Sequence, residues 1–191
     1  MKIRNTSILK KDIIFIDLDI EFHTTWGLFS PREIDEGSKL LLNSFEMKGT
    51  ENVCDLGCGY GALSLPVAKK YPNSKYLLLD KDFVAVDFAQ KNIDVNSLKN
   101  AKVLLSNGFS AVPSEEKFDI VLSNIPAKVG RELLYIFATD SFDHLEESGR
   151  IVIVCIIGLR DFVKDTLSDI FGNVKKLKES RTYIVYESIK K

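Results

Sequence analysis

A glycine-rich segment behind a short apolar run constrains the fold of this chain more than any other part of the sequence. The run at 52–56 carries Asp55 near its end, and glycines follow at Gly57, Gly59 and Gly61. Glycine adopts positive φ angles and lets the backbone pass close to a ligand. The apolar pattern that comes next indicates a helix, whose first turn offers unpaired N–H groups and the positive end of a dipole. Strand, turn and helix start together predict a binding site for a nucleoside-containing cofactor.

The composition is that of a single soluble domain. The chain has 191 residues, of which 45% are apolar and 28% are charged, and this length is enough to bury a sizeable core. The glycine-rich segment lies about a quarter of the way along the chain, so another segment precedes the nucleotide fold. We therefore expect one domain over 1–191, divided into an N-terminal lid segment at 1–48 and a cofactor-binding core at 49–191.

Charge and cysteine content exclude several classes of protein. The net charge is −1, so the chain is no general polyanion binder, although a local basic patch can still bind nucleic acid. Three cysteines without a neighbouring histidine indicate reduced thiols rather than a disulfide framework or a zinc site, and we expect no metal. No signal peptide or membrane-spanning run is visible, so a cytoplasmic location without membrane association is expected. Basic residues near both ends, which include Lys2, Arg4, Lys10 and Lys11, are interpreted as surface charge.

Apolar runs alternate with helical patterns from residue 52 onward. Strands that are apolar on both faces and alternate with helices predict an α/β fold with a doubly wound, mostly parallel sheet. Ahead of this core, 12–18 is predicted to be a strand, and a short helix is expected to be capped by Asp35 or Ser38. The expected core strands are 52–56, 75–80, 101–105, 118–123, 150–157, 174–178 and 182–187, the last two forming a hairpin, and helical spacing recurs over 84–89, 133–138 and 159–170.

Polar residues follow the predicted strands, at the edge of the sheet where open α/β folds bind ligands. Asp80 ends the second core strand, 19 residues after Gly61, and a carboxylate at this position can accept both hydroxyls of a ribose. Asn107 and Gly108 follow the third strand, and Asn124 follows the fourth. The glycines by themselves also fit the dinucleotide pattern G-x-G-x-x-G/A, so a nicotinamide oxidoreductase stays open as an alternative.

The combined motifs resemble those of a class I S-adenosylmethionine-dependent methyltransferase. The opening segment narrows the resemblance to the small-domain methyltransferases, which include the ribosomal RNA guanine-N2 methyltransferases and their archaeal relatives. The resemblance runs from about residue 22 to the C-terminus and implies a seven-stranded, Rossmann-like sheet with an N-terminal β and helix extension. The residues that carry it are Gly27–Ser30, Asp35, Gly37, Ser38, Leu40–Leu42, Asp55, Gly57, Gly59, Gly61, Asp80, Asn124 and Pro126.

The resemblance implies a role for the glycine loop and for the residues at the strand ends. The glycines would let the backbone pass under the methionyl and ribose portions of S-adenosylmethionine. Asp55 would lie near the methionine amino group, and Asp80 would hold the ribose hydroxyls. Asn107 stands where many members have an Asp that accepts from the adenine amino group, and an amide carbonyl can accept the same bond without the charge. The expected cofactor-binding residues are Phe29, Asp55, Gly57, Gly59, Gly61, Asp80, Asn107 and Gly108.

Asn124, Ile125 and Pro126 are the expected catalytic residues, because Asn124 matches the first position of the family's Asn-Pro-Pro-aromatic motif and the other two follow it. The Asn124 side chain and the Ile125 carbonyl would accept the two N–H groups of an exocyclic amine and direct its lone pair at the methyl group. The chain departs from the motif twice. Ile125 replaces the first proline, and Ala127 replaces the aromatic residue and cannot stack on a base.

The N-terminal segment holds candidates for the missing aromatic surface. Phe22, Trp26 and Phe29 would either stack on a base or form a hydrophobic lid over the cofactor. Lys128, directly after the Asn-x-Pro motif, would meet a phosphate group. Trp26 and Lys128 are therefore the expected substrate-binding residues.

These observations predict an S-adenosylmethionine-dependent N-methyltransferase. The favoured acceptor is the N2 amino group of guanine in ribosomal or other RNA, so RNA is the expected partner. Two alternatives stay open: a methyltransferase for a small molecule or a protein side chain, and a catalytically degenerate subunit that binds the cofactor. One small domain is expected to act as a monomer or a homodimer.

Overall fold

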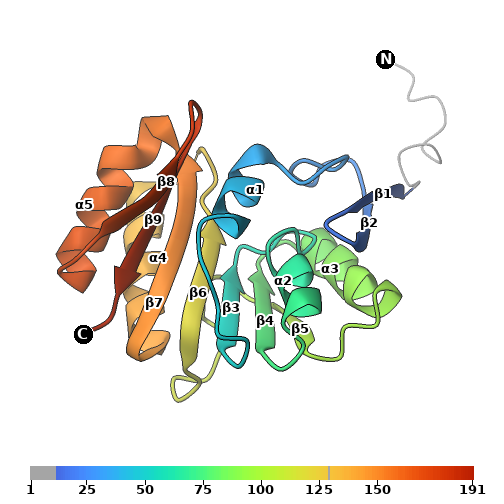
Figure 1. Cartoon of the computed structure of the whole chain (residues 1–191), viewed down its shortest axis with the longest axis horizontal. Coiled ribbons are helices and arrows are strands. Elements are labelled where there is room, and N and C mark those ends of the chain that lie inside the picture. The colour runs from blue at the N-terminus through green and yellow to red at the C-terminus, as the bar shows by residue number, and fades with distance from the viewer. Residues whose placement is uncertain (1–11, 129) are drawn as a thin grey trace.

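A seven-stranded, mostly parallel sheet runs through the centre of the molecule (Figure 1). The computed structural model describes residues 12–128 and 130–191. The strand order is β5-β4-β3-β6-β7-β9-β8, and β9 runs antiparallel to both of its neighbours. Within this sheet the chain starts at the interior strand β3, moves out to the β5 edge, and then returns to β6 and continues toward the opposite edge, which confirms the predicted doubly wound fold. The strands are β3 (Asn52–Leu56), β4 (Lys75–Asp80), β5 (Ala101–Leu105), β6 (Phe118–Asn124), β7 (Leu145–Ile156), β8 (Lys175–Glu179) and β9 (Tyr183–Ile189).

The two faces of the sheet bury separate hydrophobic cores. Side chains alternate along each strand, so Val53 belongs to one core and Cys54 to the other, and both are buried. The first core lies under α1, α2 and α3, and the second lies under α4 and α5. Burial on both faces explains why the strands read as continuous apolar runs. The helices are α1 (Glu36–Leu42), α2 (Ser64–Lys70), α3 (Phe83–Val95), α4 (Arg131–His144) and α5 (Arg160–Phe171), with the 3-10 turn η1 (Ile157–Leu159) ahead of α5.

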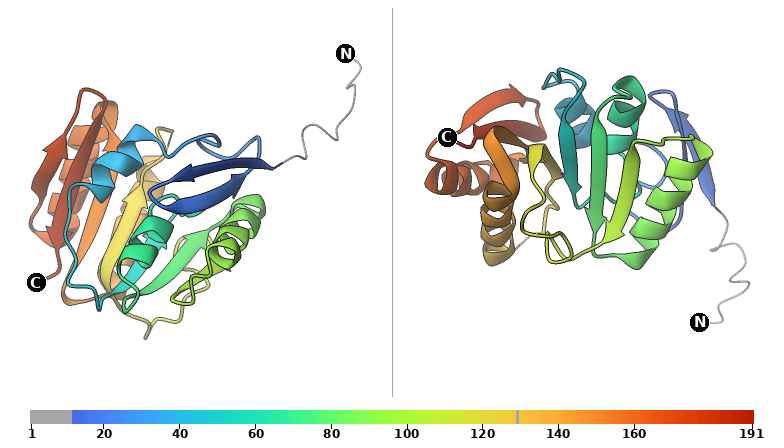
Figure 2. Two further views of the ribbon diagram at one scale, coloured as in Figure 1. Left: turned by 45° about the vertical axis from the view of Figure 1, so that its right-hand side comes forward. Right: turned by 90° about the horizontal axis from the view of Figure 1, so that it is seen from below.

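An N-terminal hairpin of β1 (Ile13–Asp17) and β2 (Ile20–Thr24) lies beside α3 (Figure 2). Asn92 of α3 fixes it in place: its Oδ1 accepts from the backbone N of His23 at 2.7 Å, and its Nδ2 donates to His23 O at 3.0 Å and to Tyr60 O at 3.0 Å. The same side chain therefore ties the hairpin to the glycine-rich segment.

Phe22 is part of this attachment. Its side chain is fully buried, and its ring packs against Phe15 at 5.2 Å and against Tyr60 at 5.5 Å between centroids. A ring buried in this way has no free face for a base. The suggestion that Phe22 supplies the missing aromatic surface is therefore wrong, because its ring is packed inside the hydrophobic core.

Local sequence signals set the element boundaries. Asp35 caps α1, since its Oδ2 accepts from the backbone N of Gly37 at 3.0 Å and of Ser38 at 3.3 Å. Pro66 is in the first turn of α2, where a missing N–H has no partner to lose. Strand β7 begins at Leu145, ahead of the predicted start at 150, because an irregular register brings Leu145 opposite Phe118.

No helix within 12–128 or 130–191 is long and apolar enough to cross a membrane. The basic residues Lys2, Arg4, Lys10 and Lys11 lie outside the described residues. The same holds for the first part of the expected lid segment. The division of the chain at 48 and 49 stays a prediction.

Candidate active site

The carboxyl ends of the parallel strands open into a cavity of about 600 Å³. It lies where the strand order reverses, with the chain leaving β3 for β4 on one side and β6 continuing on the other. Ligands bind at this place in open α/β sheets because the loops on the two sides diverge. Residues expected from the sequence contribute to its wall: Phe29, Gly57, Gly59, Asp80, Asn107, Gly108, Asn124, Ile125, Pro126 and Lys128.

The glycine loop forms one wall of the cavity. Gly57 and Gly59 have φ angles of +78° and +57°, which side-chain-bearing residues rarely adopt. A Cβ atom at either position would meet no protein atom within 4 Å. The backbone therefore faces open space and can approach a ligand. The loop is held from below by Leu79, whose carbonyl oxygen accepts from the backbone N of Gly57 at 2.8 Å and of Cys58 at 3.0 Å.

Asp80 stands at the end of β4, half-buried at the cavity wall. Its Oδ2 accepts from the backbone N of Gly59 at 2.8 Å, and its Oδ1 accepts from the backbone N of Asp82 at 2.9 Å. Each carboxylate oxygen has more than one lone pair. The side chain can therefore accept two further hydrogen bonds from adjacent hydroxyl groups of a ligand in the cavity.

Asp55 lies beneath the loop and does not line the cavity. It is fully buried; its Oδ2 accepts from Ser64 Oγ at 2.8 Å, and its Oδ1 has no hydrogen-bond partner among the described residues. Burial, opposed by the hydrogen bonds from Ser64 and assisted by the charge of Asp80, raises the pKa of Asp55 to about 7. An unpaired buried carboxyl oxygen at this place can accept from a donor that reaches through the loop.

Two further predicted residues also lie outside the cavity wall. Gly61 has a φ of +93°, and a Cβ there would come within 2.7 Å of the Leu65 side chain, so this glycine serves the packing of the loop on α2. Trp26 is 48% exposed, and Arg32 lies over its ring at 4.7 Å. Cofactor binding by Gly61 and substrate binding by Trp26 have no support from the cavity itself.

Asn124 projects from the end of β6 and is held by the helix opposite. Its Nδ2 donates to Oδ1 of Asp35 at 3.1 Å, to Oδ2 of Asp35 at 3.3 Å and to Oγ of Ser38 at 2.9 Å. A carboxylate is only an acceptor, so the amide nitrogen must face it and the amide oxygen must face the other way. Within the described residues no donor reaches Oδ1 of Asn124, which is half-buried at the cavity wall.

Ile125 replaces the proline of the family motif without disturbing the strand end. Its backbone N donates to Val154 O at 2.9 Å, which continues the β6–β7 ladder by one bond that a proline could not make. Its side chain is buried in the core under α4 and α5. Pro126 and Ala127 follow, exposed at the cavity rim.

The remaining rim is polar on one side and aromatic on another. Gly108 has a φ of +60° and its carbonyl accepts from Ser106 Oγ at 2.7 Å, which leaves Asn107 exposed at the cavity. Phe29 is 67% exposed, and Lys128 is exposed next to the Asn-x-Pro motif. An exposed ring and a cation therefore line the same cavity as Asn124.

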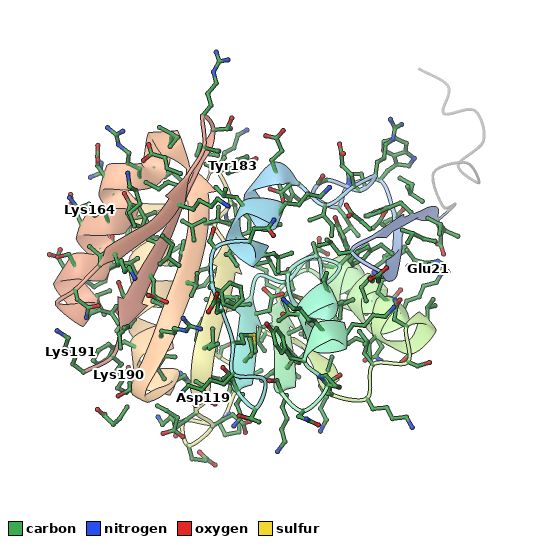
Figure 3. The ribbon with its side chains drawn as sticks, in the orientation of Figure 1. Glu21, Asp119, Lys164, Tyr183, Lys190 and Lys191 are labelled. Atoms are coloured by element: carbon green, nitrogen blue, oxygen red, sulfur yellow. The ribbon has the colours of Figure 1, made fainter. Side chains whose placement is uncertain are left out.

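Two tyrosines that complete the site were not predicted from the sequence. Tyr183 lines the cavity from β9, and its ring packs so closely on Gly37 that a Cβ there would lie 2.8 Å away. Figure 3 labels Tyr183 near the end of the sheet where the cavity opens. Tyr60 OH donates to the carbonyl oxygens of Ser30 and Glu33, which attaches the N-terminal segment to the glycine loop. None of these contacts has a local sequence signal, because each joins distant parts of the chain.

The chain is similar both to a protein of about its own length and to proteins about twice as long. The Bacillus subtilis protein YbxB is 31% identical over 175 residues, which are 90% of this chain and 87% of that protein. The ribosomal RNA small subunit methyltransferase C of Psychromonas ingrahamii is 35% identical over 169 residues, covering 86% of this chain and 47% of that protein. The chain thus spans about half the length of the ribosomal RNA methyltransferases that it matches.

A solved structure agrees with this relationship. The T. thermophilus 16S rRNA N2 methyltransferase RsmC, in complex with AdoMet and guanosine, superposes with a TM-score of 0.84 at 28% identity, over 95% of this chain and 50% of that one. A family model for the methyltransferase small domain matches residues 19–187. The fold and family predicted from the sequence are confirmed, and this chain belongs to the methyltransferase small domain family.

Proposed function

We propose that this protein transfers a methyl group from S-adenosylmethionine to the N2 amino group of guanine in ribosomal RNA. The observation that carries the proposal is the orientation of Asn124, whose amide nitrogen is bound by Asp35 and Ser38 so that its oxygen is left to accept from a ligand. The Psychromonas ingrahamii relative is a ribosomal RNA small subunit methyltransferase, and the structure of the T. thermophilus 16S rRNA methyltransferase holds AdoMet and guanosine.

The cavity fits the cofactor of this family. Gly57 and Gly59 offer backbone without side chains, Asp80 offers carboxylate lone pairs for the ribose hydroxyls, and Asn107 offers an amide for the adenine. The unpaired buried oxygen of Asp55 suits a positively charged amino group above it. When bound, S-adenosylmethionine supplies an electrophilic methyl group on a sulfonium.

Asn124 and the strand end would prepare the acceptor. The lone pair of an exocyclic amine is delocalised into the base, so the amine is a weak nucleophile. Oδ1 of Asn124 and the carbonyl oxygen of Ile125 would accept its two N–H groups, which concentrates the lone pair on nitrogen and fixes its direction. Positioning and fixed dipoles of this kind account for most of the catalysis expected in such a displacement.

The rim supports an RNA acceptor. Phe29 offers an exposed ring to a base, and base–aromatic stacking contributes about 1–3 kcal/mol. Lys128 offers a cation to a phosphate. With a ribosomal RNA substrate the enzyme would act in the cytoplasm, as a monomer or as a homodimer that extends its contact with RNA.

The test is transfer of labelled methyl groups to unmodified small-subunit ribosomal RNA, followed by digestion to nucleosides. Wild-type protein is expected to form N2-methylguanosine, and Asn124→Ala is expected to lose at least about 100-fold in kcat with little change in affinity for S-adenosylhomocysteine. Equal turnover by the two proteins would remove Asn124 from the mechanism. Label in a protein or small-molecule pool, with none in RNA, would favour the alternative acceptors that Ala127 at the rim permits.

A further inference from the structure

We propose that Asp35 is a positioning residue that fixes the direction of the Asn124 amide. The proposal rests on the proposed function, in which Oδ1 of Asn124 accepts from the acceptor amine. Asp35 has no other role assigned to it than the cap of α1. The contacts show that its carboxylate binds the first turn of α1 and the Asn124 amide at the same time.

Both oxygens of Asp35 lie within hydrogen-bond distance of Nδ2 of Asn124, but only Oδ2 also accepts from the backbone of α1. Oδ2 accepts from the backbone N of Gly37 at 3.0 Å and of Ser38 at 3.3 Å, while Oδ1 is the nearer oxygen to Nδ2 of Asn124, at 3.1 Å. The helix cap therefore locks the carboxylate in one rotamer. Because the cap is locked, the position of Oδ1 beside Asn124 is fixed by the backbone of α1.

This arrangement permits only one of the two amide orientations. The oxygen and nitrogen of an asparagine side chain occupy nearly equal volumes, so shape alone does not distinguish them. A flipped amide would place its oxygen against the Asp35 carboxylate, with two acceptors and no proton between them. The flip would also turn the NH₂ group toward the cavity, where it could not accept from an amine. Asp35 thus selects the orientation in which Asn124 is an acceptor.

Asp35→Asn tests this role with almost no change in shape. Asparagine is as good a helix cap as aspartate, so its oxygen would stay at the Gly37 and Ser38 N–H groups. Its nitrogen would then occupy the place of Oδ1 and would face Nδ2 of Asn124. The Asn124 amide is expected to flip, because its oxygen can accept from the new nitrogen.

The experiment compares wild type with Asp35→Asn, and uses Asp119→Asn as a matched control. Asp119 accepts from the backbone N of Asn52 at 2.8 Å at the opposite end of the sheet from Tyr183 (Figure 3). For Asp35→Asn we expect kcat on ribosomal RNA to fall about 10- to 100-fold. The melting temperature and the affinity for S-adenosylhomocysteine are expected to match wild type, and Asp119→Asn is expected to match it in all three measurements.

A second readout does not depend on activity. The side-chain amide protons of Asn124, identified by NMR from their loss in Asn124→Ala, are expected to exchange slowly in wild type and faster in Asp35→Asn. Unchanged exchange in Asp35→Asn would overturn the proposal even if the wild-type protein proved inactive on RNA. Inactivity of the wild type would count against the proposed function alone.

An exchanged pair supplies a rescue. In Asp35→Asn/Asn124→Asp, the carboxylate at 124 accepts from the new amide at 35 with one oxygen and leaves the other facing the cavity. We expect this double variant to recover part of the kcat lost in Asp35→Asn. A kcat no higher than that of Asp35→Asn, or a wild-type kcat in Asp35→Asn itself, would contradict the assignment.

Discussion

The carboxylate of Asp80 and the backbone of Gly59 are joined by a hydrogen bond of 2.8 Å, from N of Gly59 to Oδ2 of Asp80. The bond connects the end of β4 to the loop that follows β3. It holds the loop in a conformation with positive φ at Gly59, and the Asp80 side chain still lines the cavity. One side chain therefore shapes the loop and prepares the place where ribose hydroxyls are expected.

Removal of the Asp80 carboxylate is expected to weaken cofactor binding. Asp80→Ala loses the bond to Gly59 and the acceptors for the ribose, and hydrogen bonds to charged groups contribute about 1.5–3 kcal/mol each. We expect calorimetric affinity for S-adenosylhomocysteine to fall at least about tenfold. Asp119→Ala is the control, because it removes a carboxylate that also accepts from a backbone N, far from the cavity. A similar loss in both variants would contradict a direct role for Asp80.

Two glycines of the loop are expected to respond differently to alanine. At Gly59 a methyl group would point into open space, so Gly59→Ala should obstruct the ligand and add strain of about 1–2 kcal/mol at φ +57°. At Gly61 the methyl group would clash with Leu65 at 2.7 Å, so Gly61→Ala should destabilise the fold more. Urea unfolding and calorimetry on both variants separate these effects. The opposite ranking of stability would contradict the assignment of Gly61 to packing.

Asp55 is expected to make stability depend on pH. Burial raises the pKa of Asp55 to about 7 in the native state, from an ordinary value of 3.8. Between these two pH values the native state therefore keeps a proton that the unfolded chain has released. The free energy of unfolding then falls as pH rises from about 4 to about 7, by at most about 1.4 kcal/mol per pH unit. Asp55→Asn removes this contribution, so its stability relative to wild type should rise across the same interval. Urea unfolding at several pH values measures the difference, and parallel curves for the two proteins would contradict the prediction.

Lys128 is expected to contribute to RNA binding through a phosphate. Lys128→Gln should weaken binding of ribosomal RNA and lower the slope of log affinity against log salt by about 1, without changing cofactor affinity. Lys164→Gln is a matched control, because Lys164 is an exposed lysine on α5, away from the cavity wall (Figure 3). Titration of RNA at a series of salt concentrations gives the slope. The same change in both variants would indicate general surface charge rather than a defined contact.

Much of the site could be predicted from the sequence because parallel strands bring their carboxyl ends together. Asp80 and Asn124 come at the ends of separate apolar runs, and the doubly wound topology then places both at one cavity. The glycine loop could also be predicted, because the positive φ angles at Gly57 and Gly59 are a local requirement of the turn. Local patterns also gave Asp35 and Ser38 as candidate helix caps, and the structure shows that Asp35 is the cap.

Burial and long-range pairing could not be predicted in this way. Whether Phe22 is a free ring or a core residue depends on Phe15 and Tyr60, which approach it only in the folded chain. Gly61 and Asp55 share a motif with Gly59, yet packing against α2 and burial beneath the loop take them out of the cavity wall. Adjacent positions in a tight turn point in different directions, so spacing alone does not assign them.

Strand periodicity and turn chemistry are local properties, so the α/β fold, the glycine loop and the placement of Asp80 and Asn124 could all be predicted from the amino-acid pattern. The direction of the Asn124 amide, in contrast, is set by long-range packing. That orientation depends on Asp35, 89 residues earlier, whose carboxylate reaches Asn124 after α1 has packed against β7 and β9. An amide has no preferred direction of its own, so a distant acceptor had to supply one.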